Sequence, residues 1–320
     1  MTNNDSSEDV PQTLRNVRRK LMADAAFSKN VQRLRAPVSG RDFAVSFGSL
    51  LLGLALQVGA MSQGLWWLSP IGLTFQLAGI VGCSSVQHEA WHQRALSNRQ
   101  ANKFVAEWIL SPLFMNDFNM SARAHMSHHR YMGEDRDPDR ASWYPSWGAF
   151  WIAQLKRWMI IPAAISVLRG LGSGGRVAKR SDNEQSGVPT ATYVRIAIFH
   201  AIWIVIAVSA GWIGFFVAYL MPMLVGQTLV SIRGQREHVY LPDGRLRSFE
   251  TVCPVYERVF IGGGYFNLHA VHHVFPEIPQ RQQPELVSLI MGNENWKAIY
   301  LSTPLIVSRP SYFSARPWQD

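Results

Sequence analysis

At 320 residues the chain is long enough to form one large domain or two domains of ordinary size. Its two cysteines, Cys83 and Cys253, exclude a disulfide framework, a four-cysteine metal site and an iron–sulfur cluster built from this chain alone. The formal net charge of +9 is compatible with an anionic partner, but the basic residues are arranged around two long uncharged runs.

The N-terminal segment, residues 1–42, is predicted to be cytoplasmic, with a polar start to about residue 14 that is disordered. It opens with Met1-Thr2-Asn3-Asn4-Asp5, which lacks the basic, apolar and small-residue regions of a signal peptide. From Arg15 to Arg41 the sequence mixes apolar and basic positions. This mixture suits either an amphipathic segment on an anionic membrane leaflet or a solvated basic helix.

Two runs, residues 43–87 and 196–232, contain no Asp, Glu, Lys or Arg. A membrane helix needs about 20 residues, so each run is long enough to cross a bilayer and return. Turns are expected near Ser69-Pro70 and Gly211-Trp212. Buried helices of a soluble protein explain two such runs less well. The predicted spans are residues 43–63, 70–87, 194–210 and 212–232, arranged as two hairpins.

All 31 Lys and Arg residues lie outside the two uncharged runs. Basic residues collect on the cytoplasmic side of membrane proteins, so the N-terminal, central and C-terminal segments are all predicted to be cytoplasmic. Trp66 and Trp67 lie near the first outer turn, where interfacial aromatic residues are common. Membrane topology therefore explains the positive charge, and no nucleic-acid partner is expected.

Between the two hairpins the sequence predicts further helices. Residues 103–118 and 149–168 are apolar but interrupted, the second by Lys156-Arg157, which favours helices lying at the membrane face over spans. Met120–Tyr131 is a predicted helix. Gly170 to Pro189 is rich in glycine and polar residues and is predicted to be a flexible loop.

Eight of the ten histidines gather in three short boxes of the form H-x-x-x-H, H-x-x-H-H and H-x-x-H-H. On a helix, residues three and four apart share a face, so each box can direct its imidazoles to a common point. Eight ligands are too many for one ion, which predicts a two-metal site. Neutral imidazole binds Zn, Cu, Fe and Ni alike, so the boxes alone leave the metal open. The box histidines are His88, His92, His125, His128, His129, His269, His272 and His273.

These features predict an all-α integral membrane protein with four transmembrane helices as two hairpins and a helical cytoplasmic cap that carries the boxes. Residues 43–308 would form the membrane domain, and residues 309–320 a C-terminal tail. The metal site would then lie at the membrane surface, where a long lipid-soluble substrate can reach it from the bilayer.

The sequences HEAWH, HMSHH and HAVHH, the last followed by Phe275-Pro276-Glu277-Ile278-Pro279, resemble the membrane fatty-acid desaturase superfamily. The resemblance runs from about residue 40 to residue 290. This superfamily also includes hydroxylases, carotenoid ketolases and sphingolipid desaturases. The stretch His129-Arg130-Tyr131 with Asp135 to Asp139 is similar to the segment after the second box in several bacterial members, carotenoid ketolases among them.

The resemblance implies two non-haem irons, held by the eight box histidines, with O2 as co-substrate. It also implies an additional ligand at His238, where a surface histidine is the alternative. His200 matches no box and is predicted to be a packed or hydrogen-bonded core residue. Carboxylates that orient the ligands, or merely solvated charges, are expected among Glu89, Asp135, Asp137 and Asp139. Asn267 is expected either to bind metal-bound water or to cap a turn.

The activity implied is a desaturase that introduces a double bond into a fatty acyl or other lipid-like chain. A hydroxylase or ketolase of a carotenoid or other lipid, and a desaturase of a specialised small molecule, are the alternatives within the superfamily. A metal transporter or sensor would instead place polar ligands within its spans.

No haem, flavin or nicotinamide motif is evident, so electrons are expected from a ferredoxin or similar carrier with its reductase. The arginine-rich cytoplasmic face would be its docking surface. The compact chain favours a bacterial inner membrane, with both termini and the boxes cytoplasmic.

Overall fold

The computed structural model describes residues 10–35, 40–158, 188–240, 246–264, 266–303 and 305–313. The predicted loop from Gly170 to Pro189 lies outside them, except for its last two residues. The chain divides into two compact units. Unit 1 comprises Met1–Ser39, Arg123–Tyr144 and Leu229–Asp320, and unit 2 comprises Gly40–Ala122 and Pro145–Thr228.

In the described part of the chain, four helices are long and apolar enough to cross a membrane, which agrees with the predicted number. The first two are α3 (Arg41–Ser62) and α4 (Ser69–Trp91), the latter preceded by the 3-10 turn η1 (Trp66–Leu68). The third is α11 (Thr190–Val208). The fourth is continuous from α12 (Gly211–Phe215) through the π-helical turn η3 (Phe216–Leu220) to α13 (Met221–Glu237). From Leu229 onward, α13 belongs to unit 1.

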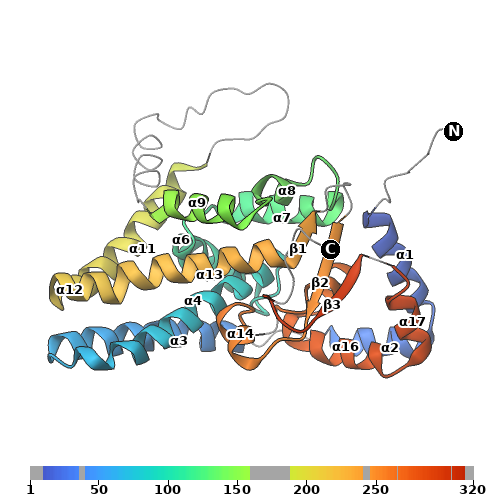
Figure 1. The fold of residues 1–320 in the computed structure, drawn as a ribbon, viewed down its shortest axis with the longest axis horizontal. Coiled ribbons are helices and arrows are strands. Elements are labelled where there is room, and N and C mark those ends of the chain that lie inside the picture. Colours follow the sequence, from blue (N-terminus) through green and yellow to red (C-terminus); the bar gives the residue numbers. More distant parts are fainter. Residues whose placement is uncertain are drawn as a thin grey trace. The chain divides into compact units, whose positions relative to one another are not determined.

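Helices α3 and α4 lie side by side and antiparallel, as Figure 1 shows, with glycines at their contact. A Cβ on Gly79 would lie 2.5 Å from the backbone nitrogen of Leu50, and a Cβ on Gly53 would lie 2.6 Å from that of Gln76. Such close backbone approach is possible only where the side chain is a hydrogen atom. The small residues of these helices therefore set how closely they pack.

His200 in α11 is a hydrogen-bonded core histidine, as predicted. Its Nε2 lies 3.0 Å from the carbonyl oxygen of Pro112, and its Nδ1 lies 3.0 Å from the hydroxyl of Tyr219. A carbonyl can only accept, so Nε2 carries the proton and Nδ1 accepts from Tyr219. Both ring nitrogens are satisfied within unit 2.

Much of the two segments predicted to lie at the membrane face, residues 103–118 and 149–168, forms shorter helices of unit 2. They are α5 (Arg99–Val105), the π-helical turn η2 (Ala106–Leu110), α6 (Ser111–Leu113) and α9 (Trp147–Trp158). Phe104 and Trp108 are exposed on the first segment, and Trp151, Ile152 and Leu155 on α9. Residues 159–168 of the second predicted helix lie outside the described part of the chain. The exposed apolar faces are those expected of interfacial helices.

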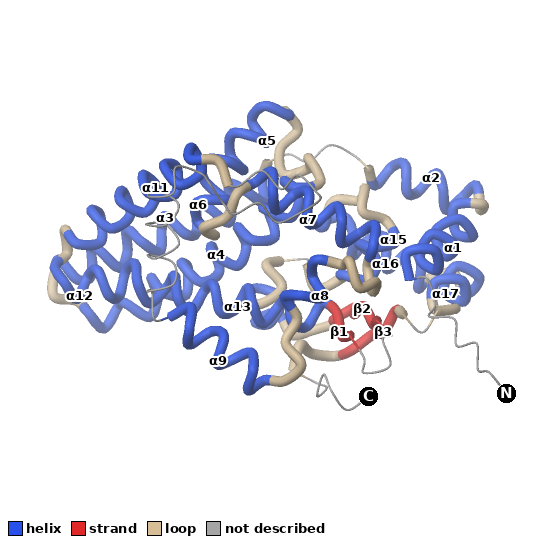
Figure 2. Tube along the Cα trace, turned by 90° about the horizontal axis from the view of Figure 1, so that it is seen from above, coloured by secondary structure: helices blue, strands red, loops and turns tan. Residues whose placement is uncertain are grey.

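Unit 1 contains short helices and a small sheet (Figure 2). Its helices are α1 (Val10–Met22), α2 (Ala25–Leu34), most of α7 (Phe118–Tyr131), α8 (Pro138–Ser142), α14 (Val255–Phe260), α15 (His269–Val274), η4 (Gln280–Gln282), α16 (Gln283–Met291) and α17 (Glu294–Tyr300). Helix α7 begins two residues before the predicted helix Met120–Tyr131 and ends at the same residue.

The sheet has three strands, β1 (His238–Tyr240), β2 (Leu246–Thr251) and β3 (Ile306–Arg309), in the order β1-β2-β3. β1 pairs antiparallel with β2, and β2 pairs parallel with β3. The fold is mostly helical as predicted, but the three strands were not expected from the sequence. Strands this short have little periodicity of their own and form only when the third strand arrives from a distant segment.

The N-terminal segment differs from both of its predicted states. Helix α1 begins at Val10, within the stretch expected to be disordered, and the apolar faces of α1 and α2 are buried in the core of unit 1. Phe27, for example, contacts the rings of Phe275 and Trp296. An amphipathic pattern shows that one face is apolar and leaves open what covers that face. Here the protein itself covers it.

The close contact of α3 and α4 yields a prediction. Gly79→Ala should lower the thermal unfolding midpoint of the protein in detergent, because the new methyl group overpacks the contact at a cost of about 1–3 kcal/mol. Gly59→Ala is the matched control on α3, since no heavy atom lies within 4 Å of its added Cβ, and alanine favours a helix by about 1 kcal/mol over glycine. Equal midpoints for the two variants would contradict the packing argument.

Candidate metal centre

Unit 1 contains seven of the nine histidines proposed from the sequence as metal ligands. They come from three elements that are far apart in the sequence: α7 with the second box, β1 with His238, and α15 with the third box. The three elements bring the seven imidazoles into two clusters, one of four histidines and one of three.

The four-histidine cluster consists of His128, His238, His269 and His273, all of them buried. His238 is at its centre. The His238 Nε2 atom lies 3.1 Å from the Nε2 of His128, 2.9 Å from that of His269 and 3.0 Å from that of His273. Four nitrogens this close together satisfy one another poorly as hydrogen-bond partners, because each neutral imidazole has one donor and one acceptor. Four converging imidazole nitrogens are a typical metal-ligand set.

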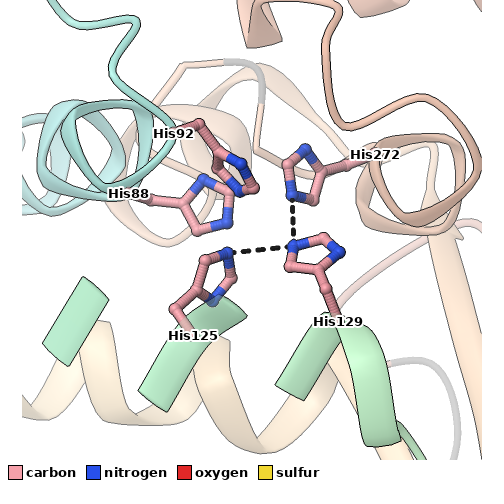
Figure 3. Close-up of side chains that lie close together, drawn as sticks. All are labelled: His88, His92, His125, His129 and His272. Atoms are coloured by element: carbon pink, nitrogen blue, oxygen red, sulfur yellow. Dashed lines mark hydrogen bonds between the residues drawn. The ribbon is translucent and has the colours of Figure 1, made fainter. Parts of the chain in front are cut away.

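The three-histidine cluster of unit 1 consists of His125, His129 and His272. Figure 3 shows the three rings facing one another, with the Nε2 of His129 3.0 Å from that of His125 and 3.1 Å from that of His272. His125 and His129 project from successive turns of α7. This cluster has fewer ligands within unit 1 than its neighbour.

The helical period explains how two boxes supply two clusters. Residues i and i+4 of a box lie on one line along the helix, and residue i+3 is displaced to its side. In α7 the pair His125 and His129 belongs to the three-histidine cluster and His128 to the other. In α15 the assignment is reversed, since His269 and His273 belong to the four-histidine cluster and His272 to the three-histidine cluster.

The first box lies in unit 2. His88 is in the last turn of α4 and is buried, and His92 is the residue that caps this helix. Their ring centroids are 5.0 Å apart, and both rings are drawn in Figure 3. Burial, together with the nearby charge of Arg94, lowers the pKa of His92 to about 4, so its imidazole is neutral and able to bind a metal.

Asp137 fixes the orientation of His128. Its Oδ1 lies 2.9 Å from the Nδ1 of His128, so Nδ1–H donates to the carboxylate and the Nε2 lone pair is directed into the cluster. Asp137 is buried and also accepts from the Tyr240 hydroxyl and the backbone N–H of Gly133. Burial opposes its ionisation, but these donors and His128 outweigh it and hold its pKa below the usual value. The carboxylate is therefore ionised, and both of its oxygens accept hydrogen bonds.

The other candidate carboxylates differ from Asp137 in their surroundings. Asp139 lies beside it, 3.5 Å from the Nδ1 of His128. Asp135 has a 98% exposed side chain and pairs with Arg140, and among the described residues it contacts no clustered histidine. Glu89 is buried in α4 next to His88. Asn267 donates from its side-chain amide to the carbonyl of Thr251, which ties the segment before α15 to β2.

The protonation of the four-histidine cluster favours metal binding at three of its members. Burial, and then the neighbouring imidazoles, lower the pKa of His269 and His273 well below the ordinary value, and burial does the same for His238. Burial also acts against protonation of His128, but the carboxylates of Asp139 and Asp137 outweigh it and raise that pKa. The negative charge beside His128 would strengthen its bond to a cation.

Helix α15 has six residues, too few to be stable alone, and both of its ends are held by distant side chains. At its start, the backbone N–H of Val271 donates to the buried carboxyl of Glu250 in β2, which also accepts from the Tyr300 hydroxyl. Because Glu250 lies in the sheet, β2 positions α15.

At the end of α15, Arg18 donates to the carbonyl oxygen of Val274 at 3.3 Å. The same guanidinium pairs with Glu277 at 2.6 Å, and Arg35 also pairs with Glu277 at 2.6 Å. The N-terminal helices therefore contact the segment that directly follows the third box.

Sequence reasoning missed Glu250 and Arg18 as residues that support the site. Glu250 lies in a polar stretch, Leu246–Thr251, that carries no motif, and Arg18 was one of many basic residues in its segment. Glu277 belongs to the sequence that follows the third box, where nothing indicated that it would pair with arginines. Glu237 was also missed, although it directly precedes His238 in the sequence. Its Oε2 lies 4.0 Å from the Nε2 of His269.

The comparisons with known proteins agree with the histidine pattern. A family model described as fatty acid desaturase matches residues 18–300 of the chain, well over half of its length. The matched range contains all three boxes and His238. No curated protein matches the chain.

The contact between Asp137 and His128 predicts an effect on metal affinity. Asp137→Asn should weaken metal binding by roughly 10- to 100-fold, as losses of carboxylates behind histidine ligands do elsewhere. The amide has one acceptor oxygen for the donors that the carboxylate serves, and it removes the charge beside His128. The measurement is a chelator competition titration of the purified protein.

Asp135→Asn is the matched control, two residues away and exposed. It should retain wild-type affinity. Equal losses in both variants would show that charge near the turn, and not the hydrogen bond to His128, determines the affinity.

Glu250 predicts a pH dependence of stability. Burial raises its pKa from 4.5 to about 8, although Tyr300 and Val271 donate to it. A carboxyl whose pKa is raised on folding stabilises the folded state fully below about 4.5, and this stabilisation is lost as the pH rises to about 8. The unfolding midpoint of wild type should therefore fall across this range relative to Glu250→Gln, whose amide does not titrate. Glu294→Gln, at an 85% exposed side chain, is the control, and its unfolding midpoint should change with pH as that of wild type does.

Proposed function

The chain belongs to the fatty acid desaturase family, and we propose that it is a membrane di-iron desaturase that uses O2 to introduce a double bond into a fatty acyl or other lipid-like chain. Membership of the family makes the protein an oxidoreductase of the desaturase and hydroxylase type. The four long apolar helices found among its described residues make it a membrane protein, and the family implies a lipid substrate.

The observation that carries the proposal is the four-histidine cluster of unit 1. Its donor atoms are all imidazole nitrogens, buried, and within 4.8 Å of one another. Imidazole is a good ligand for divalent iron and a poor one for Mg²⁺ or Ca²⁺, which prefer oxygen. The residues present therefore fit iron.

We assign the ligands of both irons to histidine. In this proposal one iron is held by His128, His238, His269 and His273, and the other by His125, His129 and His272 together with the first box. The contribution of His88 and His92 rests on the sequence pattern, in which the three boxes occur together across the family. Bound iron would supply the activation of O2 that removes hydrogen from an unactivated carbon.

The chain's own residues would then control the site in three ways. Asp137 keeps the proton of His128 on Nδ1, so that Nε2 stays available as a ligand. Glu250 and Arg18 hold α15 at both ends and so limit the movement of its three histidines. Burial of the four-histidine cluster keeps bulk water away from its nitrogens.

Electrons would come from a separate carrier, a ferredoxin or a similar protein with its reductase. Arg123 and Arg130 are exposed on α7, the helix that carries the second box. A basic surface there suits an acidic carrier, because opposite charges speed association and orient the partners. We propose this surface as the docking site.

The proposed location is a bacterial inner membrane, with the boxes and both termini on the cytoplasmic side. The distribution of charge supports this orientation, since all 31 Lys and Arg residues lie outside the two uncharged runs. In this orientation all three boxes lie in cytoplasmic segments.

The test combines metal content with product analysis. Wild type and His128→Ala/His129→Ala would be expressed with a ferredoxin and its reductase, and the cells' lipids and metabolites compared by mass spectrometry. We expect purified wild type to hold two irons per chain and the variant to lose iron, because one ligand is removed from each cluster. Wild-type cells should contain a product that lacks two hydrogens relative to its precursor.

His200→Ala is the matched control, because this histidine lies outside the clusters. It should keep its iron and its product even if its unfolding midpoint falls. A product with one additional oxygen would replace the desaturase proposal by a hydroxylase or ketolase. Wild type without iron would contradict the di-iron proposal altogether.

A further inference from the structure

Unit 1 has an apolar patch on its surface, outside the four long apolar helices. It consists of Val252, Val255, Tyr256 and Phe313, which are 70%, 65%, 62% and 57% exposed. We call these four residues the valine–tyrosine patch. Contiguous exposed apolar surface on a folded protein marks a place where another surface or a membrane is bound.

Hydrogen bonds hold the patch together as one surface. The N–H of Val252 donates to the carbonyl of Arg309 at 2.8 Å. Glu257, next to Tyr256, accepts from the N–H of Tyr312 at 2.8 Å. The C-terminal residues are therefore bonded both to the end of β2 and to α14. These bonds hold Phe313 in the same part of unit 1 as the two valines.

The patch is also attached to the end of a candidate membrane span. Arg236, in the last turn of α13, donates to the carbonyl of Tyr312, and Arg309 donates to the carbonyl of Arg236. Arg236 is 1% exposed, so this attachment is buried and rigid. All of these residues belong to unit 1.

The length of that span sets the level of the patch relative to a bilayer. The helix from Gly211 to Glu237 has 27 residues, so it is roughly 40 Å long, against about 30 Å for the hydrocarbon core. If this helix spans a bilayer, its last two turns, which contain Arg233 and Arg236, would lie in the headgroup region. A surface bonded to Arg236 would then lie at the same level.

We propose that the valine–tyrosine patch inserts into the interfacial region of the lipid bilayer and anchors unit 1 to the membrane. Its composition suits this role. Valine and phenylalanine side chains gain from leaving water, and tyrosine places its ring among acyl chains and its hydroxyl among headgroups. Arg258, half-buried on the same short helix, supplies a cation for lipid phosphate.

Fluorescence quenching in vesicles tests the proposal. The full chain with Cys253→Ser and Val255→Cys would be labelled with bimane and reconstituted into phosphatidylcholine–phosphatidylglycerol vesicles. Cys83 is completely buried and should not react. Glu294→Cys in the same background is the control, at an exposed charged position of unit 1. Val252→Cys provides a second position in the patch in case Val255→Cys folds poorly.

We expect lipids carrying a shallow doxyl group to quench the label at Val255→Cys strongly and aqueous iodide to quench it several-fold less than at Glu294→Cys. Equal iodide quenching at both positions would overturn the proposal, because the patch would then face water. Protection from both quenchers would overturn it in favour of a contact with a second copy of the chain. Protection that appears only after addition of an acidic electron carrier would identify a protein-docking surface instead.

Discussion

The structure of unit 1 depends on holding uncharged imidazole nitrogens close together in a buried place. The Nε2 atoms of His128, His269 and His273 each lie about 3 Å from that of His238, and their lone pairs repel unless a cation or shared protons lie between them. Folding must therefore restrain the elements that carry them. Without a bound cation the cluster is a cost to stability, and with one it becomes a source of stability, since ligand binding to the folded state adds to the free energy of unfolding.

Much of the restraint comes from residues other than the clustered histidines. Helix α15 is too short to persist alone, and it is held by Glu250 from the sheet and by Arg18 from the N-terminal helices. β1 begins with His238 and pairs with β2, so the same sheet positions a ligand and the helix opposite it. The small sheet and the N-terminal helices thus serve the geometry of the clusters, although neither contributes a ligand beyond His238.

The candidate membrane helices and the valine–tyrosine patch are the parts of the protein proposed to contact lipid. In unit 2, glycines allow α3 and α4 to approach closely, and His200 and Tyr219 satisfy each other inside the apolar bundle. In unit 1, buried hydrogen bonds join the end of α13 to the C-terminal residues of the patch. A lipid-like substrate that diffuses in the bilayer would meet the protein at the level where these groups lie.

The sequence by itself determined the four apolar helices of the described residues, the helix of the second box and the grouping of histidines that could hold a metal, because charge depletion and helical spacing are local properties of the chain. Only the tertiary structure decided which histidine joins which cluster, that Asp137 contacts His128 while Asp135 faces solvent, and that α1 and α2 are buried against Phe275. It also decided the three-stranded sheet and the role of Glu250. The contact of Asp137 with His128 depends on how the turn after α7 folds. The other features depend on contacts between segments far apart in the sequence, and no local pattern encodes which distant surface will cover a given face.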